Sequence, residues 1–297
     1  MPFLKAGDLV RFVSPASRPD PAGVARGVEA LESWGLRVEV APHAFDKHGY
    51  LAGTDGDRLD DLARALLDPA VRAVFATRGG KGSYRIADRL PVEAMKRDPK
   101  PIVGFSDITI LLLEAWRTIG AAGVHGAFSS HGDGAWSTVS EQSLRHALMS
   151  DAPVAIEASP DVASADLTTS GSARGPLLGG NLDMLATAAG WALPSLRGAV
   201  LLIESVGLAI GHFDRCLTML VRGGHFDGVA GVAVGRIDGT PANGPIDALW
   251  LLRDHLARFD VPILGGLPIG HGADARSVVI GAQTTLDADR GRLLQHR

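Results

Sequence analysis

Three things that the sequence has little of exclude whole classes of protein. Its 297 residues include a single cysteine, Cys216, which excludes an internal disulfide framework and any multi-cysteine zinc or iron–sulfur site. Lys and Arg number 29 against 33 Asp and Glu, so there is no basic surplus with which to bind a nucleic acid. No run of about 18 uncharged apolar residues occurs, so we expect no membrane span.

The first residues also lack the apolar core of a secretory signal peptide, because Lys5, Asp8 and Arg11 interrupt them. We therefore expect a cytoplasmic protein, and the weaker alternative is a mature secreted form whose signal peptide has been removed. Hydrophobic residues make up 46% of the chain and charged residues 21%, which is enough apolar side chain to build a buried core. A chain of this length usually forms two domains or one large one.

Short apolar runs alternate with helical patterns in the first half of the chain. The helical period is clear where Leu59, Leu62 and Leu66 recur, and Thr138-Val-Ser-Glu141 resembles a capping box that opens a helix. This alternation predicts an α/β fold, in which a parallel sheet is covered by helices and binds ligands beyond the carboxyl ends of its strands. We expect strands at 9–13, 36–40, 71–77 and 102–104 and one ending at 124, and helices at 21–34, 59–67, 108–119 and 138–149.

Residues 151–174 break this rhythm, because they are rich in Ala, Ser, Asp and Thr. We predict an N-terminal α/β domain over 1–150, a linker with an extended segment over 151–175, and a C-terminal domain of mixed α+β structure over 176–297. In the second half we expect helices at 181–189, 213–221 and 246–259, and strands at 200–203, 229–234, 278–280 and 284–286.

Ser106 stands where the strand ending at Gly104 meets the next helix. At such a turn a serine Oγ projects from the sheet edge, beside the free N–H groups of the first helical turn, which can stabilise an oxyanion. The segment Gly104-Phe-Ser-Asp-Ile108 lacks the second glycine of the G-x-S-x-G pattern. From this segment, Ser106 is either a catalytic nucleophile or a helix N-cap.

The segment Thr77-Arg-Gly-Gly-Lys-Gly-Ser-Tyr-Arg85 also follows a predicted strand, so its amides face the same sheet edge as Ser106. Its glycines let a ligand approach the main chain, to bind a phosphate or to donate an N–H to an oxyanion. It does not match the P-loop pattern, because Gly82 follows Lys81 where that pattern needs Ser or Thr. A tight turn that needs glycine is the alternative.

Two further side chains complete a possible triad. Glu204 ends an apolar strand, and a carboxylate there needs a partner, either Arg215 or a histidine that it orients. His271 lies between glycines in a turn-rich loop, where an imidazole can act as a general base. The order Ser106, Glu204, His271 is that of the α/β-hydrolase triad, and here it would span the two domains.

Asn181 precedes a predicted helix and is either a cap or a substrate contact. His43, His48, His125 and His131 show no metal-ligand spacing, so we assign no metal.

Several short motifs resemble, in their order and spacing, the serine L,D-carboxypeptidase family of the muramoyl-tetrapeptide carboxypeptidase type. The resemblance runs nearly end to end. Its motifs are Gly7-Asp8, Val13-Ser-Pro15, Arg78-Gly-Gly-Lys-Gly82, Gly104-Phe-Ser-Asp-Ile-Thr109, His125-Gly126, Gly179-Gly-Asn-Leu182, Phe213-Asp-Arg215 and Leu267-Pro-Ile-Gly-His271.

The resemblance implies Ser106 as nucleophile, Glu204 as orienting carboxylate and His271 as base, with an oxyanion hole that we map to the backbone N–H groups of Gly80 and Asp107. It implies a flavodoxin-like N-terminal sheet, a β-rich C-terminal domain and commonly a homodimer. It further implies a cytoplasmic enzyme that needs no metal or cofactor and removes the terminal D-alanine from a recycled murein tetrapeptide.

Two other residues, Arg78 and Asn181, are candidates for substrate binding. The sequence departs from the family pattern at Lys81, Ala127 and Ser205, around the expected pocket, and these departures leave the substrate open.

Two alternatives follow. A related branch of the family resembles the self-immunity peptidases that cleave peptidyl-nucleotide antibiotics such as processed microcin C. In the second alternative, the protein is a non-catalytic nucleotide- or anion-binding protein that uses residues 78–85 as its anion site.

Overall fold

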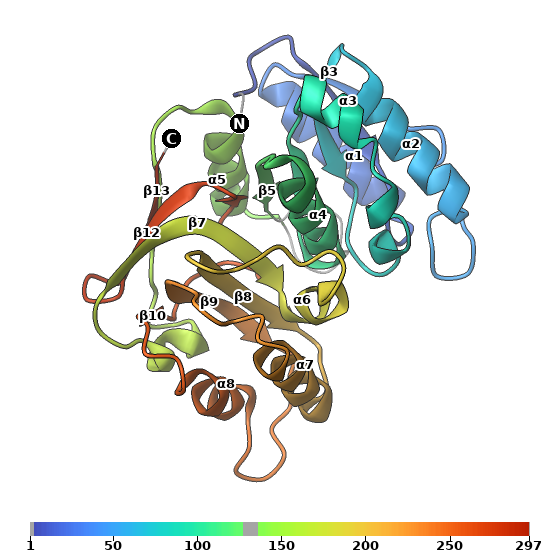
Figure 1. Ribbon diagram of the computed structural model, residues 1–297. Helices are drawn as coiled ribbons and strands as arrows, with labels where there is room; N and C mark the ends of the chain where they lie inside the picture. Colours follow the sequence, from blue (N-terminus) through green and yellow to red (C-terminus); the bar gives the residue numbers. More distant parts are fainter. Residues whose placement is uncertain (1–2, 127–135, 297) are drawn as a thin grey trace.

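The N-terminal half forms a parallel sheet in the computed structural model, which describes residues 3–126 and 136–296 (Figure 1). The six-stranded sheet has the order β11-β5-β4-β3-β1-β2. Its parallel strands have the flavodoxin-like order 2-1-3-4-5, which confirms the predicted fold class. Only β11, from the C-terminal half, runs antiparallel within the described sheet. The strands are β1 (Leu9–Val13), β2 (Arg37–Val40), β3 (Val71–Ala76), β4 (Ile102–Gly104), β5 (Gly123–His125) and β11 (Val278–Ile280).

The N-terminal helices follow the predicted ones closely, with one correction at a helix start. The N-cap of α5 is Ser137, whose hydroxyl accepts from the Ser140 N–H, so Thr138 does not open a capping box. Glu141 accepts a hydrogen bond from the Trp34 indole instead. The helices are α1 (Pro21–Ser33), α2 (Asp55–Leu67), α3 (Val92–Arg97), α4 (Thr109–Ile119) and α5 (Thr138–Met149), with short 3₁₀ helices η1 (Ser83–Arg85), η2 (Ala87–Arg89) and η3 (Ser106–Ile108).

The C-terminal half builds a seven-stranded sheet of order β10-β9-β8-β7-β12-β13-β6, half parallel and half antiparallel. In Figure 1 its longest strand, β7, arches across the sheet, and α7 packs against both α6 and α8. The strands are β6 (Val154–Glu157), β7 (Ser172–Asn181), β8 (Val200–Val206), β9 (Gly231–Asp238), β10 (Ile263–Leu264), β12 (Gln283–Asp287) and β13 (Arg292–Gln295). The helices are η4 (Ala163–Leu167), α6 (Leu182–Ala188), α7 (Ile210–Arg222) and α8 (Ala248–Leu256).

The segment predicted as a linker contributes to this sheet. Its extended stretch is β6, which pairs with β13, and β7 runs across position 175. The division of the chain at residues 150 and 176 stays a prediction.

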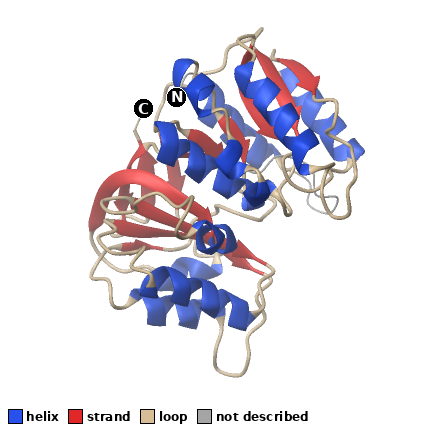
Figure 2. Cartoon of the chain, turned by 45° about the vertical axis from the view of Figure 1, so that its right-hand side comes forward, coloured by secondary structure: helices blue, strands red, loops and turns tan. Residues whose placement is uncertain are grey.

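One hydrophobic core joins the two sheets, because α4 lies between them (Figure 2). Leu111 of α4 is fully buried in the same cluster as Val74 of β3 and Leu202 of β8. The start of α4 also touches the end of β7, where the Asn181 N–H donates to Thr109 Oγ1 at 3.2 Å. The carboxyl ends of β4, β7 and β8 therefore meet at one place. Across residues 3–126 and 136–296, no helix has the length and apolarity needed to cross a bilayer.

Candidate active site

Ser106 occupies a strained turn directly after β4. Its φ of 61° lies in the left-handed region, and among the described residues it is the only non-glycine with a positive φ. Such a conformation costs about 1–2 kcal/mol and tends to persist where function requires it. The turn is also tightly packed, since a Cβ on Gly79 would lie 2.8 Å from Ser106 Cβ. This is the geometry of a nucleophile elbow rather than of an ordinary helix cap.

The glycine-containing loop after β3 is hydrogen-bonded to this turn. The Ser83 N–H donates to Asp107 Oδ2 at 2.8 Å, and Ser83 Oγ donates to the Asp107 carbonyl at 2.6 Å. Burial raises the pKa of the Asp107 carboxyl, although the hydrogen bonds from Ser83 oppose that rise. No described residue accepts a hydrogen bond from the Gly80 N–H. The loop is thus fixed against the serine turn, with a backbone donor left over for a ligand.

Glu204 is completely buried near the end of β8 and has specific partners. Its Oε2 accepts from His271 Nδ1 at 2.8 Å, and its Oε1 accepts from Asn181 Nδ2 at 3.1 Å. Burial alone would raise the pKa of this carboxyl, but the adjacent imidazole of His271 and its hydrogen bonds hold the pKa at about 2. Glu204 is therefore ionised throughout the neutral range. Its partner is a histidine and not Arg215, which is exposed.

His271 is held by two contacts that leave one ring nitrogen available. Its Nδ1 is bonded to Glu204, and its ring packs on Phe105, with the ring centroids 4.8 Å apart. Phe105 directly precedes Ser106, so the imidazole is stacked beside the serine turn. The side chain is 22% exposed, which leaves Nε2 as the nitrogen able to exchange a proton with a ligand or with Ser106.

A cavity of about 520 Å³ is lined by residues from both halves of the chain, among them Ser106 and His271. Its lining residues are Gly80, Lys81, Ser106, Asp107, Asn181, Asp183, Met184, Val206, Gly207, Leu208, Ala209, His212 and His271. Both predicted oxyanion-hole residues and two of the three predicted triad residues line it, and Glu204 lies behind His271. A second cavity, of about 490 Å³ beside Trp116, contains none of them.

The two substrate-binding candidates differ in position. Asn181 lines the cavity, but its amide is hydrogen-bonded to Glu204, so it also orients the Glu204 carboxylate. Arg78 is absent from the cavity lining, and its guanidinium donates to the Arg18 carbonyl at 3.3 Å. Burial lowers the pKa of Arg78.

Of the three departures from the family pattern, Lys81 is exposed on the cavity wall and Ser205 is buried. Ala127 lies outside the described residues.

Sequence reasoning missed His125, which the motif His125-Gly126 contained. It is 1% exposed at the end of β5, and its Nε2 lies 3.8 Å from Glu204 Oε1, beyond hydrogen-bonding distance. Its ring also contacts Phe105, at a centroid distance of 6.2 Å. His125 therefore packs against Phe105, where its ring faces the buried Glu204 carboxylate.

The free thiol of Cys216 is not a candidate nucleophile. Burial, together with the neighbouring Asp183 carboxylate, raises the pKa of its thiol to about 12. Because the thiolate is the reactive form, the thiol is unreactive at neutral pH.

Comparison with known proteins gives a consistent result over nearly the whole chain. The profile of the LD-carboxypeptidase N-terminal domain matches residues 10–126, and that of the LD-carboxypeptidase C-terminal domain matches residues 174–286. A protein of Streptomyces coelicolor named as a carboxypeptidase is 39% identical over 302 residues, covering 99% of this chain and 95% of its own. The murein tetrapeptide carboxypeptidase of Pseudomonas aeruginosa is 28% identical, covering 95% of this chain and 94% of its own.

Solved structures share the fold. A single-residue mutant of the microcin C7 self-immunity protein MccF, in complex with adenosine monophosphate, superposes with a TM-score of 0.87 at 22% identity, covering 99% of this chain and 97% of its own. A muramoyltetrapeptide carboxypeptidase from Oxalobacter formigenes superposes with a TM-score of 0.84 at 23% identity, covering 97% of this chain and 99% of its own.

Proposed function

Since the chain belongs to the LD-carboxypeptidase family, a family of serine carboxypeptidases, we propose that Ser106, His271 and Glu204 form its catalytic triad and that its substrate is a murein tetrapeptide. The enzyme would cleave the terminal L,D peptide bond and release D-alanine. The observation that carries this proposal is the 2.8 Å bond between His271 Nδ1 and the buried Glu204, at the cavity that the strained Ser106 also lines.

In the first half of the reaction, Glu204 holds the His271 ring with its proton on Nδ1, so Nε2 is an acceptor. Nε2 takes the proton of Ser106 Oγ as the oxygen attacks the scissile carbonyl carbon. The N–H groups of Gly80 and Asp107 donate to the resulting oxyanion. His271 then gives its proton to the amine of D-alanine as the C–N bond breaks and an acyl-Ser106 ester forms.

In the second half, a water molecule replaces the leaving amine. His271 Nε2 accepts a proton from this water, whose oxygen attacks the ester carbonyl. The tetrahedral intermediate collapses, the C–O bond to Ser106 breaks, and Ser106 Oγ recovers its proton from His271. The products are the shortened peptide and a free enzyme with every proton in its starting place.

A carboxypeptidase has to recognise the terminal carboxylate of its substrate. Among the described residues that line the cavity, Lys81 is the only lysine or arginine, and its side chain is exposed. We assign the carboxylate to this ammonium group, since it offers charge without a competing partner in the cavity wall.

The decisive experiment is Ser106→Ala, assayed by D-alanine release from a purified muramoyl tetrapeptide. We expect loss of turnover with the fold intact by circular dichroism. Ser33→Ala, an exposed serine at the end of α1, is the control and keeps full activity. Turnover by Ser106→Ala at the rate of the control would eliminate the mechanism.

A second candidate substrate is a peptidyl- or aminoacyl-nucleotide amide, because Lys81 also offers a cation to a nucleotide phosphate. Comparing kcat/KM for the two substrate classes separates them, and both require Ser106. The non-catalytic anion-binding role has less support, since Arg78 does not line the cavity and Arg85 is paired with Asp55 at 2.8 Å. A calorimetric titration with nucleotides tests it.

We further propose that the enzyme acts in the cytoplasm, where recycled murein peptides arrive, and that it forms a homodimer. Sedimentation equilibrium of the purified chain tests the homodimer. Fractionation of cells that express the chain tests the location.

A further inference from the structure

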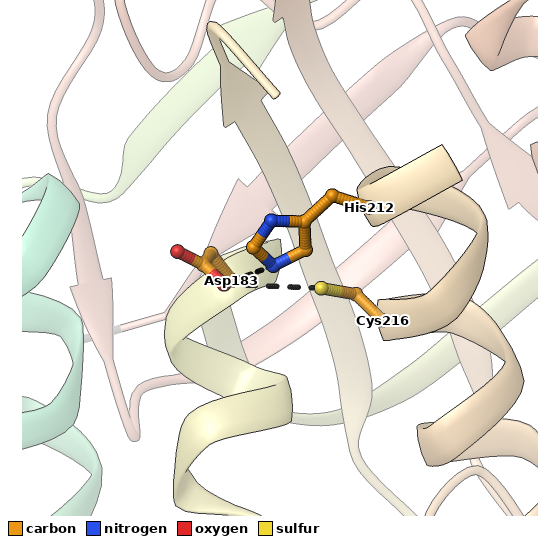
Figure 3. A group of neighbouring side chains, drawn as sticks. All are labelled: Asp183, His212 and Cys216. Carbon is orange, nitrogen blue, oxygen red and sulfur yellow. Dashed lines mark hydrogen bonds and ion pairs between the residues drawn. The ribbon is translucent and has the colours of Figure 1, made fainter. Parts of the chain in front are cut away.

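A cluster of three side chains, two of which line the cavity, has no part in the proposed triad. His212 and Cys216 stand four residues apart on α7, so both lie on one face of that helix. Asp183, in the first turn of α6, reaches across to them (Figure 3). His212 Nε2 lies 3.0 Å and Cys216 Sγ 3.8 Å from the same oxygen, Asp183 Oδ1.

These spacings are close to those of a tetrahedral zinc site. Zinc bonds of about 2.0 Å to oxygen and nitrogen and about 2.3 Å to sulfur place an oxygen about 3.3 Å from a nitrogen ligand and about 3.5 Å from a sulfur ligand. All three ligand atoms of the cluster lie within 4.8 Å of one another. A small rotation of His212, whose side chain is 45% exposed, would bring its nitrogen into place.

The cluster also has the accessibility of a site that a cation can enter. Cys216 is 2% exposed, so the thiol forms the protected inner side. Asp183 and His212 line the 520 Å³ cavity, so an ion can arrive from the solvent that fills it. The carboxylate and the thiolate would together balance the two charges of the ion.

We propose that Asp183, His212 and Cys216 bind Zn²⁺, with a fourth coordination position open to the cavity that contains Ser106. On binding, the thiol proton leaves to solvent and sulfur bonds to the metal as thiolate. The sequence hides this site, because the two ligands on α7 are 29 and 33 residues away from Asp183.

Occupation of this site inhibits the enzyme. The ion would sit in the wall of the substrate cavity, where it fills space and draws a substrate carboxylate away from Lys81. This consequence rests on the proposed peptidase function, whereas metal binding itself does not.

The binding test uses Co²⁺ as a spectroscopic substitute for zinc, added to the metal-free full chain in a non-coordinating buffer. Because the sequence has one cysteine, a thiolate-to-cobalt charge-transfer band can come only from Cys216. We expect this band in the wild-type protein and its loss on adding Zn²⁺. We expect it to be absent in Cys216→Ser and strongly reduced in His212→Gln.

The matched control is His255→Gln. His255 Nε2 forms a similar pair with Asp214 Oδ1 at 2.8 Å, but the metal-ligand groups found among the described residues do not include it. This variant keeps the band and the wild-type zinc affinity by calorimetry, while His212→Gln and Cys216→Ser bind zinc at least about tenfold more weakly. No band in the wild-type protein, or an equal affinity in all four proteins, overturns the site.

The inhibition test measures D-alanine release with and without Zn²⁺ within each variant. Wild type and His255→Gln lose activity on adding zinc and regain it with a chelator, while the activity of Cys216→Ser does not respond to zinc. Equal inhibition of Cys216→Ser would place the inhibitory ion elsewhere and refute this part. If no variant releases D-alanine, the proposed peptidase function fails, and the cobalt spectrum still decides the metal site.

Discussion

Replacing Glu204 by Gln should remove most of the activity, because Asn181 dictates how the new amide lies. A carboxylate can only accept hydrogen bonds, so Asn181 presents its NH₂ group to Oε1. In Glu204→Gln, the amide oxygen has to stay at that position to accept this bond. The NH₂ group of the glutamine then faces His271 Nδ1, which becomes an acceptor.

That arrangement moves the imidazole proton to Nε2, the nitrogen that has to accept from Ser106. The opposite arrangement of the amide would set two NH₂ groups against each other, and a buried donor without a partner costs about 1–3 kcal/mol. The wrong tautomer is therefore favoured. In serine proteases the corresponding carboxylate-to-amide change lowers kcat by about 10⁴. We expect a loss of that order here, with KM nearly unchanged.

The assay is D-alanine release under saturating substrate, with thermal unfolding as a check on the fold. A second substitution tests the role given to Asn181. Asn181→Asp in the Glu204→Gln background supplies an acceptor for the glutamine NH₂, which lets the amide oxygen turn to His271. The double variant should recover at least about tenfold in kcat over Glu204→Gln. Activity of Glu204→Gln within about tenfold of wild type, or no recovery in the double variant, would refute the role given to Asn181.

Three other measurements test single contacts. The pKa of Glu204 is about 2 in the folded chain against an ordinary 4.5, so its carboxylate should contribute about 3 kcal/mol to stability above pH 4.5, and this contribution is lost as pH falls toward 2. Urea unfolding at about pH 7 and pH 3 should show this loss in wild type and not in Glu204→Gln. An equal change in the free energy of unfolding between the two pH values in both proteins would contradict it. Lys81→Ala should raise KM about fivefold at constant kcat, because the variant loses one exposed charge contact with the substrate. Lys81→Arg keeps the charge and should keep the wild-type KM. An unchanged KM in the alanine variant would argue against the contact assigned to the substrate carboxylate. Gly180→Ala should lower the free energy of unfolding by about 1–3 kcal/mol, because φ is 141° and the new Cβ would lie 2.7 Å from Thr109 Oγ1. Adding Thr109→Ala should restore part of this stability. A wild-type Tm for Gly180→Ala would contradict the prediction, since it would show that Thr109 moves aside at no cost.

Much of the N-terminal sheet could be predicted because short apolar runs such as β1, β3 and β4 alternate with helical patterns. The second sheet was harder. β7 contains Gly175, Gly179 and Gly180, which weaken any strand pattern. Gly175 and Gly179 are nevertheless needed where other backbone approaches closely, and Gly180 is needed where the Thr109 side chain does. β6 has alternating burial in only four residues, so composition marked its segment as a linker. Tertiary pairing with β13 makes it a strand.

Some residues of the site could also be predicted from the sequence, and others could not. Ser106, Glu204 and His271 could be proposed because each follows a strand or stands in a glycine-rich loop, where side chains reach a ligand. The second role of Asn181 could not, since it depends on a bond between β7 and β8 that no local pattern encodes. The motif that contained His125 gave no sign of its position behind Glu204.

The hydrophobic core that runs through α4 has a consequence for how this enzyme can lose its activity. The turn that holds Ser106 is attached to one sheet and the His271–Glu204 pair to the other, yet both rest on the same buried core. Partial unfolding of either half would thus separate the reacting groups long before the rest of the chain denatures. Catalytic turnover should be the most sensitive available reporter of whether the two halves remain docked.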